Sequence, residues 1–334
     1  MPERAAPVLR PLTLALLSKL TAERFTSGET LAQTLGVSRR AVMTAAHEAH
    51  EVGVEVFAVP RKGYRLAAPL ELLNLKTIHT AMGKAARRVD LDAVPVIDST
   101  NSAIAARLAR GAPSGIALAA EWQSAGRGRR GRAWAMPFGA GLTFSLGWRF
   151  ARTAAELGGL SLAVGVAVAR AIDHFQPAQP VQLKWPNDIV SDGKKLGGIL
   201  IESQGDMLGP VAVTVGIGLN VHLPEDFAST VDQPIADVAS LCSAPVSRNL
   251  LLARVLTELV STLDTFQTHG FAPIRAAWLQ RNAHAGAQVR VQPGDGTWFD
   301  AEVRGVGEDG SLIVLRAGED VLLHGGEISV RKKS

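Results

Sequence analysis

The sequence holds a single cysteine, Cys242, among its 334 residues. One cysteine excludes an intramolecular disulfide and a cysteine-rich metal cluster, and it favours a reducing compartment, so we expect a cytoplasmic protein. The eight histidines show no spacing typical of metal ligands, and we expect structural roles for them. Internal repeats and low-complexity tracts are also missing from the sequence.

Long apolar runs are scarce as well. Residues 8–20 are apolar but short, are interrupted by charged residues and proline, and lack a small-residue cleavage site, so we expect neither a secretion signal nor a membrane anchor. The net charge of +4 permits contact with nucleic acid without arguing for it. The 47% hydrophobic and 20% charged residues are typical of a globular protein, and the length predicts two or three domains.

The N-terminal residues follow a helix-turn-helix pattern. Ser27 is a candidate cap for one helix, Gly36 supplies a tight turn, and Ser38 is a candidate cap for a second helix. A recognition helix presents its first residues to the major groove of DNA. The candidate DNA contacts are therefore Ser38, Arg39 and Arg40, which can hydrogen-bond to phosphates or base edges.

A two-stranded hairpin is predicted to follow the second helix. Residues 52–59 alternate as a strand, and residues 64–66 return after a basic turn that contains Arg61 and Lys62. A hairpin in this place is a wing, and the two basic side chains suit a phosphate contact. A winged domain that serves protein contacts, or that has lost its DNA partner, is the alternative. We expect residues 1–66 to form this domain and residues 67–69 to be a linker.

Residues 121–134, E-W-Q-S-A-G-R-G-R-R-G-R-A-W, combine four arginines with three glycines inside seven positions. Glycine allows close approach of a ligand to the backbone, and arginine offers a fork of donors that fits phosphate or carboxylate. Without an anion such a loop should repel itself and be mobile. An active-site loop that closes on phosphate, a nucleic-acid patch and a solvated basic loop all remain possible on composition.

The central residues, 67–283, are predicted to mix strands and helices. A short apolar strand at 94–97 leads into Asp98-Ser99-Thr100-Asn101 and then a helix at 103–109. These polar groups at a strand exit can bind a ligand, although helix capping alone would explain the first two. Further strands are expected at 116–120, 142–148 and 213–220, with a core helix at 158–173.

Residues 181–202 are predicted to form two strands, 181–185 and 196–202, around one turn rich in proline, asparagine, aspartate and glycine. Asn187 and Asp188 in this turn could bind magnesium through oxygen atoms, although an ordinary turn would explain the same residues. Lys195 opens the second strand. Glycines at 216 and 218 leave one backbone face open, as if something lies against it. From 284 to 334, short strands separated by glycine turns predict a small β-barrel.

Five segments in this order, G-R-G-R-R-G-R-A-W, K-W-P-N-D, G-K-K-L-G-G-I-L-I-E, G-I-G-L-N and G-G-E-I-S-V-R, closely resemble biotin–protein ligases. The helix-turn-helix ahead of them resembles the bifunctional members, which also repress biotin synthesis genes. The resemblance implies an α+β protein with a winged helix-turn-helix domain (1–66), a central mixed α/β ligase domain with a class II synthetase-like sheet (67–283), and an SH3-like β-barrel (284–334).

The activity implied by the resemblance joins biotin to the α-phosphate of MgATP, giving biotinyl-5′-AMP, and then biotinylates a lysine of the biotin carboxyl carrier protein of acetyl-CoA carboxylase. Biotin operator DNA and a homodimer promoted by the adenylate are the other implied partners. Lys195, Arg129 and Arg132 are the implied catalytic residues, offsetting the repulsion between carboxylate and triphosphate. No enzyme nucleophile is needed for this chemistry.

The resemblance also implies the binding residues. Those for biotin are Ser99, Thr100, Asn101, Gln123, Arg127, Gly128, Arg129, Lys195, Gly198, Gly216 and Gly218. Those for the nucleotide are Arg132, Trp134, Asn187, Asn220 and Arg331, and Asp188 is the implied magnesium ligand. The loop over the adenylate is expected at residues 224–235.

Two positions depart from the family pattern. The second helix lacks the basic residue that family repressors carry in mid-helix, and the loop at 224–235 lacks the tryptophan that some members place over adenine, with Ile235 its nearest counterpart. A ligase with a non-regulatory wing, and a biotin-responsive regulator without catalysis, are therefore weighed beside a ligase that also represses. Retention of Arg132, Asn187, Asp188 and Lys195 disfavours the regulator, and the arginine loop disfavours a lipoate ligase.

Overall fold

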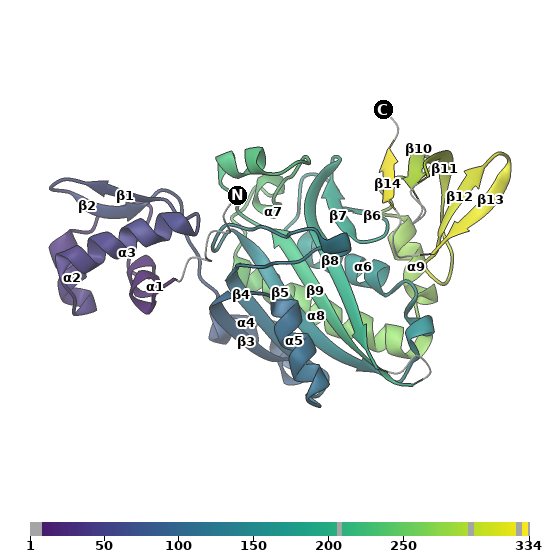
Figure 1. The fold of residues 1–334 in the computed structure, drawn as a ribbon, viewed down its shortest axis with the longest axis horizontal. Coiled ribbons are helices and arrows are strands. Elements are labelled where there is room, and N and C mark those ends of the chain that lie inside the picture. The colour runs from purple at the N-terminus through teal and green to yellow at the C-terminus, as the bar shows by residue number, and fades with distance from the viewer. Residues whose placement is uncertain (1–8, 206–208, 293–296, 325–328, 333–334) are drawn as a thin grey trace.

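The structure, a computed structural model, describes residues 9–205, 209–292, 297–324 and 329–332, with side chains up to residue 324. Its α-helices are α1 Pro11–Leu17, α2 Gly28–Leu35, α3 Arg39–Glu51, α4 Leu75–Met82, α5 Thr100–Ala109, α6 Leu160–Asp173, α7 Val238–Leu241, α8 Arg248–His269 and α9 Ala272–Leu279. Short 3-10 helices are η1 Gly83–Arg88, η2 Arg129–Gly131, η3 Ala154–Leu157 and η4 Glu225–Thr230. Figure 1 shows these elements in three parts along the long axis of the molecule.

The strands form three sheets. The strands are β1 Val56–Val59, β2 Gly63–Leu66, β3 Asp90–Ile97, β4 Ile116–Gln123, β5 Gly141–Phe150, β6 Gln182–Lys184, β7 Asp188–Ser191, β8 Lys194–Gln204, β9 Val211–Asn220, β10 Gln288–Gln292, β11 Phe299–Val306, β12 Leu312–Arg316, β13 Glu319–Leu323 and β14 Ser329–Lys332. The predicted α+β architecture is confirmed.

The winged helix forms because residues within its own sequence supply the helix caps and the turn. Ser27 Oγ accepts the amide of Thr30, and Ser38 Oγ accepts the amide of Ala41, so α2 and α3 begin where predicted. Gly36 ends α2 in the left-handed region at φ 65°. The wing pairs β1 with β2, but β1 is shorter than predicted, because residues 52–55 turn out of α3 and lend only alternate side chains to the domain core.

The central sheet has seven strands in the order β3-β4-β5-β9-β8-β7-β6, and only the β3–β4 pair is parallel. The two strands predicted within 181–202 are three: Asp188 opens the additional strand, β7, which pairs with both β6 and β8. The prediction of one turn there was wrong, because a four-residue strand between two turn sequences has too few residues to show alternation.

Each long strand of the sheet sends alternate residues to opposite faces. In β5 the even positions, such as Leu142 and Phe144, are apolar and join the core with α4, α6, α8 and α9. The other face carries polar and small residues of β5 and β9 and is covered by α5, as seen in Figure 1. The polar face of the sheet is therefore the α5 face.

One segment, Ala154–Asp173, is long and apolar enough by composition to cross a membrane. It comprises η3 and α6, and 61% of its apolar window is buried inside the protein. The side chains of α6 pack against α8 and β8, which makes it a core helix of the central domain.

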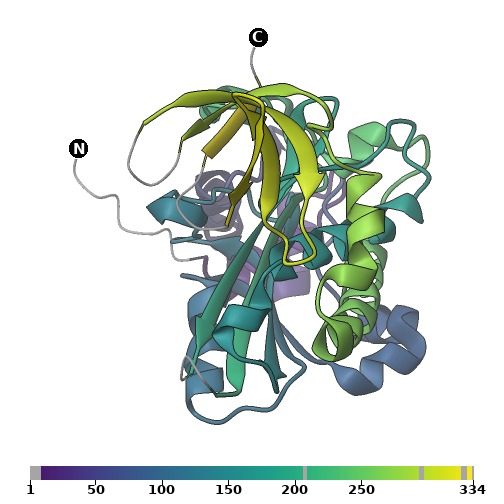
Figure 2. The same cartoon turned by 90° about the vertical axis from the view of Figure 1, so that its right-hand side faces the viewer.

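The C-terminal strands form an antiparallel sheet in the order β13-β12-β11-β10-β14, and the strand β14 was not predicted. This sheet shares one hydrophobic cluster with the central domain. Trp185 Nε1 donates to the carbonyl of Gly310 at 3.1 Å, and Arg275 Nε donates to the carbonyl of Val306 at 2.6 Å. Figure 2 shows the sheet lying over that end of the central domain.

The winged helix is joined to the central domain by packing as well as by the chain. Phe138, at 2% exposure, lies in the hydrophobic core of the winged helix, and its amide donates to the carbonyl of Val52 at 3.0 Å. Trp122 packs against the same core. These two residues flank residues 123–137, so both ends of the segment that contains the arginine loop rest on the winged helix.

The linker between these parts is held by a buried arginine. Arg248, at the start of α8, is fully buried and forms an ion pair with Glu121 at 2.7 Å. Its guanidinium also donates to the carbonyls of Gly141 and Glu71. A charge in such a place needs all its donors satisfied, and here linker, β4 and β5 supply the acceptors together.

Candidate active site

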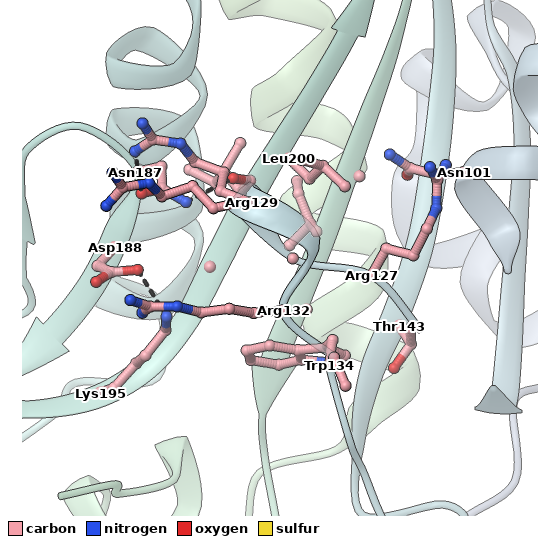
Figure 3. A pocket seen from close by; sticks show the side chains of 18 of the residues that line it. Asn101, Arg127, Arg129, Arg132, Trp134, Thr143, Asn187, Asp188, Lys195 and Leu200 are labelled. Atoms are coloured by element: carbon pink, nitrogen blue, oxygen red, sulfur yellow. Dashed lines mark hydrogen bonds and ion pairs between the residues drawn. The ribbon is translucent and has the colours of Figure 1, made fainter. Parts of the chain in front are cut away.

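A cavity of about 480 Å³ opens on the α5 face of the central sheet. Its walls come from β4, β5, β8 and β9, from the start of α5, and from the arginine loop between β4 and β5. The structure brings these predicted site residues together around it: Ser99, Thr100, Asn101, Gln123, Arg127, Gly128, Arg129, Arg132, Trp134, Asn187, Asp188, Lys195, Gly198, Gly216 and Gly218. Figure 3 shows part of this set as sticks.

One part of the cavity is neutral and hydrogen-bonded. Gln123 Oε1 accepts the amide and the hydroxyl of Thr100 at 2.7 and 3.0 Å. Ser145 Oγ, from β5, lies 2.8 Å from Thr100 Oγ1 and 2.5 Å from Asn101 Oδ1. Ser99 caps α5 through its side chain. The sequence analysis missed Ser145, although a polar residue on the α5 face of a buried apolar strand was a usable signal.

The glycines of β9 make room for side chains of the site itself. A Cβ at Gly216 would overlap the amide of Asn101, and a Cβ at Gly218 would overlap the indole of Trp134. The sequence pattern correctly indicated close approach, but the neighbours are protein groups. Gly198 is less crowded, with Lys195 Cε 3.5 Å from the place of a Cβ.

The arginine loop is a closed turn. The amide of Gly128 donates to the carbonyl of Arg132 at 2.7 Å, and the amide of Trp134 donates to the carbonyl of Gly126 at 2.8 Å. Arg130 and Gly131 take left-handed φ values of 59° and 70°. The arginine side chains of this loop repel one another, so hydrogen-bonding partners stabilise the turn. Residues of the central sheet supply some of these partners.

Arg129 donates to Asn187 Oδ1 at 3.0 Å. Burial lowers the pKa of its guanidinium, Asp188 opposes that shift, and the neighbouring Arg130 and Arg132 add to it. An arginine remains charged under any such shift, so the loop keeps a partly desolvated cation inside the cavity.

Lys195 lies opposite the neutral part of the cavity. Its Nζ is 2.7 Å from Asp188 Oδ1, with both side chains about one-fifth exposed, and 5.8 Å from the ring centroid of Trp134. Figure 3 places Asn187, Asp188 and Lys195 at one side, Asn101 and Arg127 at the other, and Trp134 between them. The indole Nε1 of Trp134 is buried and has no hydrogen-bond partner among the residues that the structure describes, which leaves a donor for a bound molecule.

The cavity concentrates positive charge. Among the described residues, its lining has six cations, Arg127, Arg129, Arg130, Arg132, Lys184 and Lys195, and two acids, Asp188 and Asp232. A field of this sign favours a polyanionic ligand.

Asp188 and Asn187 are the oxygen donors for a predicted magnesium ion. No group of three or more potential acidic, histidine or cysteine metal ligands occurs among the described residues. Asp188 is ion-paired with Lys195, and Asn187 accepts from Arg129. This donor set fits an ion held mainly by a ligand's own phosphates, as magnesium often is.

Of the predicted nucleotide residues, Asn220 does not line the cavity, and the side chain of Arg331 lies outside the described part of the chain. Asn220 is 4% exposed, and its amide donates to the carbonyls of Lys195 and Ala236 at 3.2 and 2.9 Å, so it ties two segments together behind the site. Arg331 lies on β14, where only the backbone is described. From the predicted covering loop, Asp232 and Gln233 line the cavity, whereas Ile235 pairs with Lys195 in a backbone bridge.

The predicted DNA contacts lie on a separate surface. Ser38, Arg39 and Arg40 are exposed at the start of α3, and Arg61 and Lys62 are exposed at the wing tip. Arg61 takes a left-handed φ of 65° there. The nucleic-acid interpretation of the arginine loop is thus not needed, because the winged helix has basic side chains of its own.

Comparison with known proteins separates the winged helix from the domain that contains the cavity. Residues 93–220 match the biotin/lipoate A/B protein ligase family, and residues 13–65 match a helix-turn-helix domain. The chain is 36% identical to the bifunctional ligase/repressor BirA of Escherichia coli, over 95% of this chain and 97% of that protein. It is 31% identical to the protein of the same name from Bacillus subtilis, over 87% and 89%.

Two further similar proteins are named as biotin ligases. The biotin–[acetyl-CoA-carboxylase] ligase of Mycobacterium tuberculosis is 33% identical over 79% of this chain and 97% of that protein. Among solved structures, a biotin protein ligase from Aquifex aeolicus in complex with biotin and ATP has a TM-score of 0.61 and 25% identity, covering 73% of this chain and 99% of that one.

Proposed function

The chain belongs to the biotin–protein ligase family, among the members with an N-terminal helix-turn-helix domain, and from this premise we propose how its cavity works. The enzyme activates biotin with ATP to give biotinyl-5′-AMP and pyrophosphate. It then transfers the biotinyl group to a lysine of a carrier protein, which we take to be the biotin carboxyl carrier protein of acetyl-CoA carboxylase. The compartment we propose is the cytoplasm.

The observation that carries this proposal is that one cavity combines uncharged hydrogen-bonding side chains, beside which Arg127 is paired with Glu202, with cations on the opposite side. The hydroxyl and amide groups of Ser99, Thr100, Asn101 and Gln123 suit the uncharged ureido ring of biotin. The cations suit its carboxylate and the phosphates of ATP, which repel each other unless fixed positive groups offset that repulsion.

Lys195 and the loop arginines share the work of bringing the two anions together. Lys195 stabilises charge on the carboxylate as it attacks the α-phosphate, and Arg129 and Arg132 hold phosphate oxygens. Trp134 covers the reacting groups, with its free indole N–H as a donor. Exclusion of water matters here, because a mixed anhydride hydrolyses readily.

A magnesium ion would be held by Asp188 and Asn187 together with the phosphates, and it would neutralise phosphate charge when bound. Arg331 and Asn220 belong to the nucleotide side of the proposal, Asn220 by fixing the backbone of Lys195 and Ala236.

The ligase proposal is tested by incubating the protein with ATP, labelled biotin and a carrier-protein domain. Label should appear on the carrier lysine, and wild-type protein that transfers no label contradicts the proposal. Protein that binds biotin and DNA yet transfers nothing would instead be a regulator without catalysis.

We further propose that the winged helix binds biotin operator DNA as a homodimer promoted by the adenylate. Paired half-sites are the usual targets of such domains, which supports a dimer. A gel shift with a biotin-synthesis promoter, with and without biotinyl-AMP, tests the repressor role, and Arg39→Ala with Arg40→Ala should weaken the shift. If no shift is seen at moderate salt, the protein acts only as a ligase and its winged helix no longer regulates transcription.

A further inference from the structure

Glu202 joins two walls of the cavity that are far apart in the sequence. It lies on β8, on the α5 face of the sheet. Its Oε2 accepts a hydrogen bond from Asn101 Nδ2 at 2.7 Å and another from Arg127 Nη2 at 2.8 Å. The first partner belongs to α5, and the second belongs to the arginine loop. No other described acidic side chain accepts from both α5 and the loop.

The Asn101 side of this connection is rigid. Asn101 is 5% exposed, its other amide atom is bonded to Ser145, and its side chain fills the space left by Gly216. Glu202 itself has about one-third of its side chain exposed, whereas 45% of the Arg127 side chain is exposed. A fixed wall on one side and a loop side chain on the other make Glu202 the point where the loop is fastened.

The guanidinium of Arg127 is engaged by this carboxylate. Arg129 and Arg132, which are expected to act on the phosphates, and Lys195, which is expected to act on the carboxylate, gather toward the opposite side in Figure 3. Arg127 is paired with Glu202 at the stem of the loop, whereas Lys195 is paired with Asp188 on the other side of the cavity. Its side chain is placed to hold the loop down, leaving its backbone to face the ligand.

We propose that Glu202 is a positioning residue that latches the arginine loop through Arg127 and sets how long the adenylate is protected from water. The proposal rests on the ligase function above. With the loop unlatched, water attacks the acyl carbon of biotinyl-5′-AMP, the bond from that carbon to the phosphate oxygen breaks, and biotin and AMP are released. The latch acts on retention of the intermediate, while its formation still depends on the other cations.

If the pair of Arg127 and Glu202 served only stability, its loss would change the melting temperature and not the retention of the adenylate. The exposed pair between Arg127 and Glu202 adds little to stability, so the melting temperature of Arg127→Ala should hardly differ from that of wild type. The measurements are therefore AMP released per pyrophosphate without carrier protein, together with KM for biotin and kcat of adenylate formation. The variants are Glu202→Ala, Glu202→Gln, Arg127→Ala and the double alanine variant.

The matched control is Asp264→Ala, which removes the exposed ion pair between Asp264 and Arg88 far from the cavity. We expect Glu202→Ala to raise AMP leakage and KM about tenfold, since it removes two charge-assisted hydrogen bonds, with kcat changed much less. Glu202→Gln keeps one acceptor and should fall between wild type and alanine. The control should match wild type.

The double variant gives the decisive comparison. If Arg127 and Glu202 act as one latch, the double alanine variant leaks no more than either single variant. Leakage equal to wild type in Glu202→Ala, or multiplied effects in the double variant, overturns the latch. Wild-type protein that forms no adenylate contradicts the ligase proposal instead, so the two failures are distinct.

Discussion

Replacing Lys195 by methionine should nearly abolish adenylate formation. Methionine keeps most of the side-chain length and removes the charge, so the packing against Trp134 is largely preserved. Loss of one preorganised group that stabilises developing charge costs about 3 kcal/mol, which is roughly a hundredfold in rate. The structure adds a second cost, because Lys195 is the 2.7 Å partner of Asp188.

Without the lysine, the Asp188 carboxylate faces the incoming anions with its charge uncompensated. The rate of adenylate formation by Lys195→Met should therefore fall by more than a hundredfold. The double variant Lys195→Met with Asp188→Asn should regain roughly tenfold of that rate. Asp188→Asn alone provides the matched single change and shows what the carboxylate contributes through a metal ion.

The assay is pyrophosphate release, or exchange of labelled pyrophosphate into ATP, at saturating biotin and at low salt, where screening of the cavity is least. Pyrophosphate release at the wild-type rate by Lys195→Met refutes the role of the lysine. A double variant as slow as the product of the single effects refutes the argument about uncompensated charge.

Three further outcomes follow from the packing and charges. Gly216→Ala should displace Asn101 and raise KM for biotin at least tenfold, as two buried hydrogen bonds are lost, and an unchanged KM would contradict this. Phe138→Ala should lower the free energy of unfolding by about 3 kcal/mol in urea titrations that follow the winged helix, and a change below about 1 kcal/mol would count against the shared core. The pKa of Glu48 is lowered, chiefly by its hydrogen bond with Arg10, so its contribution is present above the ordinary glutamate pKa and is lost as pH falls through the lower, folded value. The difference in melting temperature between wild type and Glu48→Gln should thus shrink as the pH is lowered from neutral to below the ordinary glutamate pKa, and a constant difference would refute the linkage.

The parts of the fold that sequence reasoning captured are those whose signals are local. Ser27, Gly36 and Ser38 mark the helix-turn-helix by their own chemistry, and the structure uses each as predicted. The helix α8 was not identified, although its 22 residues are the longest described helix, because its buried face is broad and its pattern mixes apolar and polar positions.

The site could be predicted as a set of residues but not as a network. The resemblance named just over half of the residues that line the cavity, including Asn101 and Arg127. It did not identify Glu202, because that residue acts through partners 101 and 75 positions away, and no local pattern records a contact of that range. Ser145 was missed for the same reason, since its role depends on strand register.

The seating of Trp122 and Phe138 in the winged-helix core has a practical consequence for dissecting the protein. A catalytic fragment cut at the linker would expose both aromatic side chains and remove the support from each end of the arginine loop. Such a fragment would report on a loosened loop as well as on a missing DNA-binding domain. Point substitutions on the exposed face of α3, which leave that aromatic contact in place, separate the two functions cleanly.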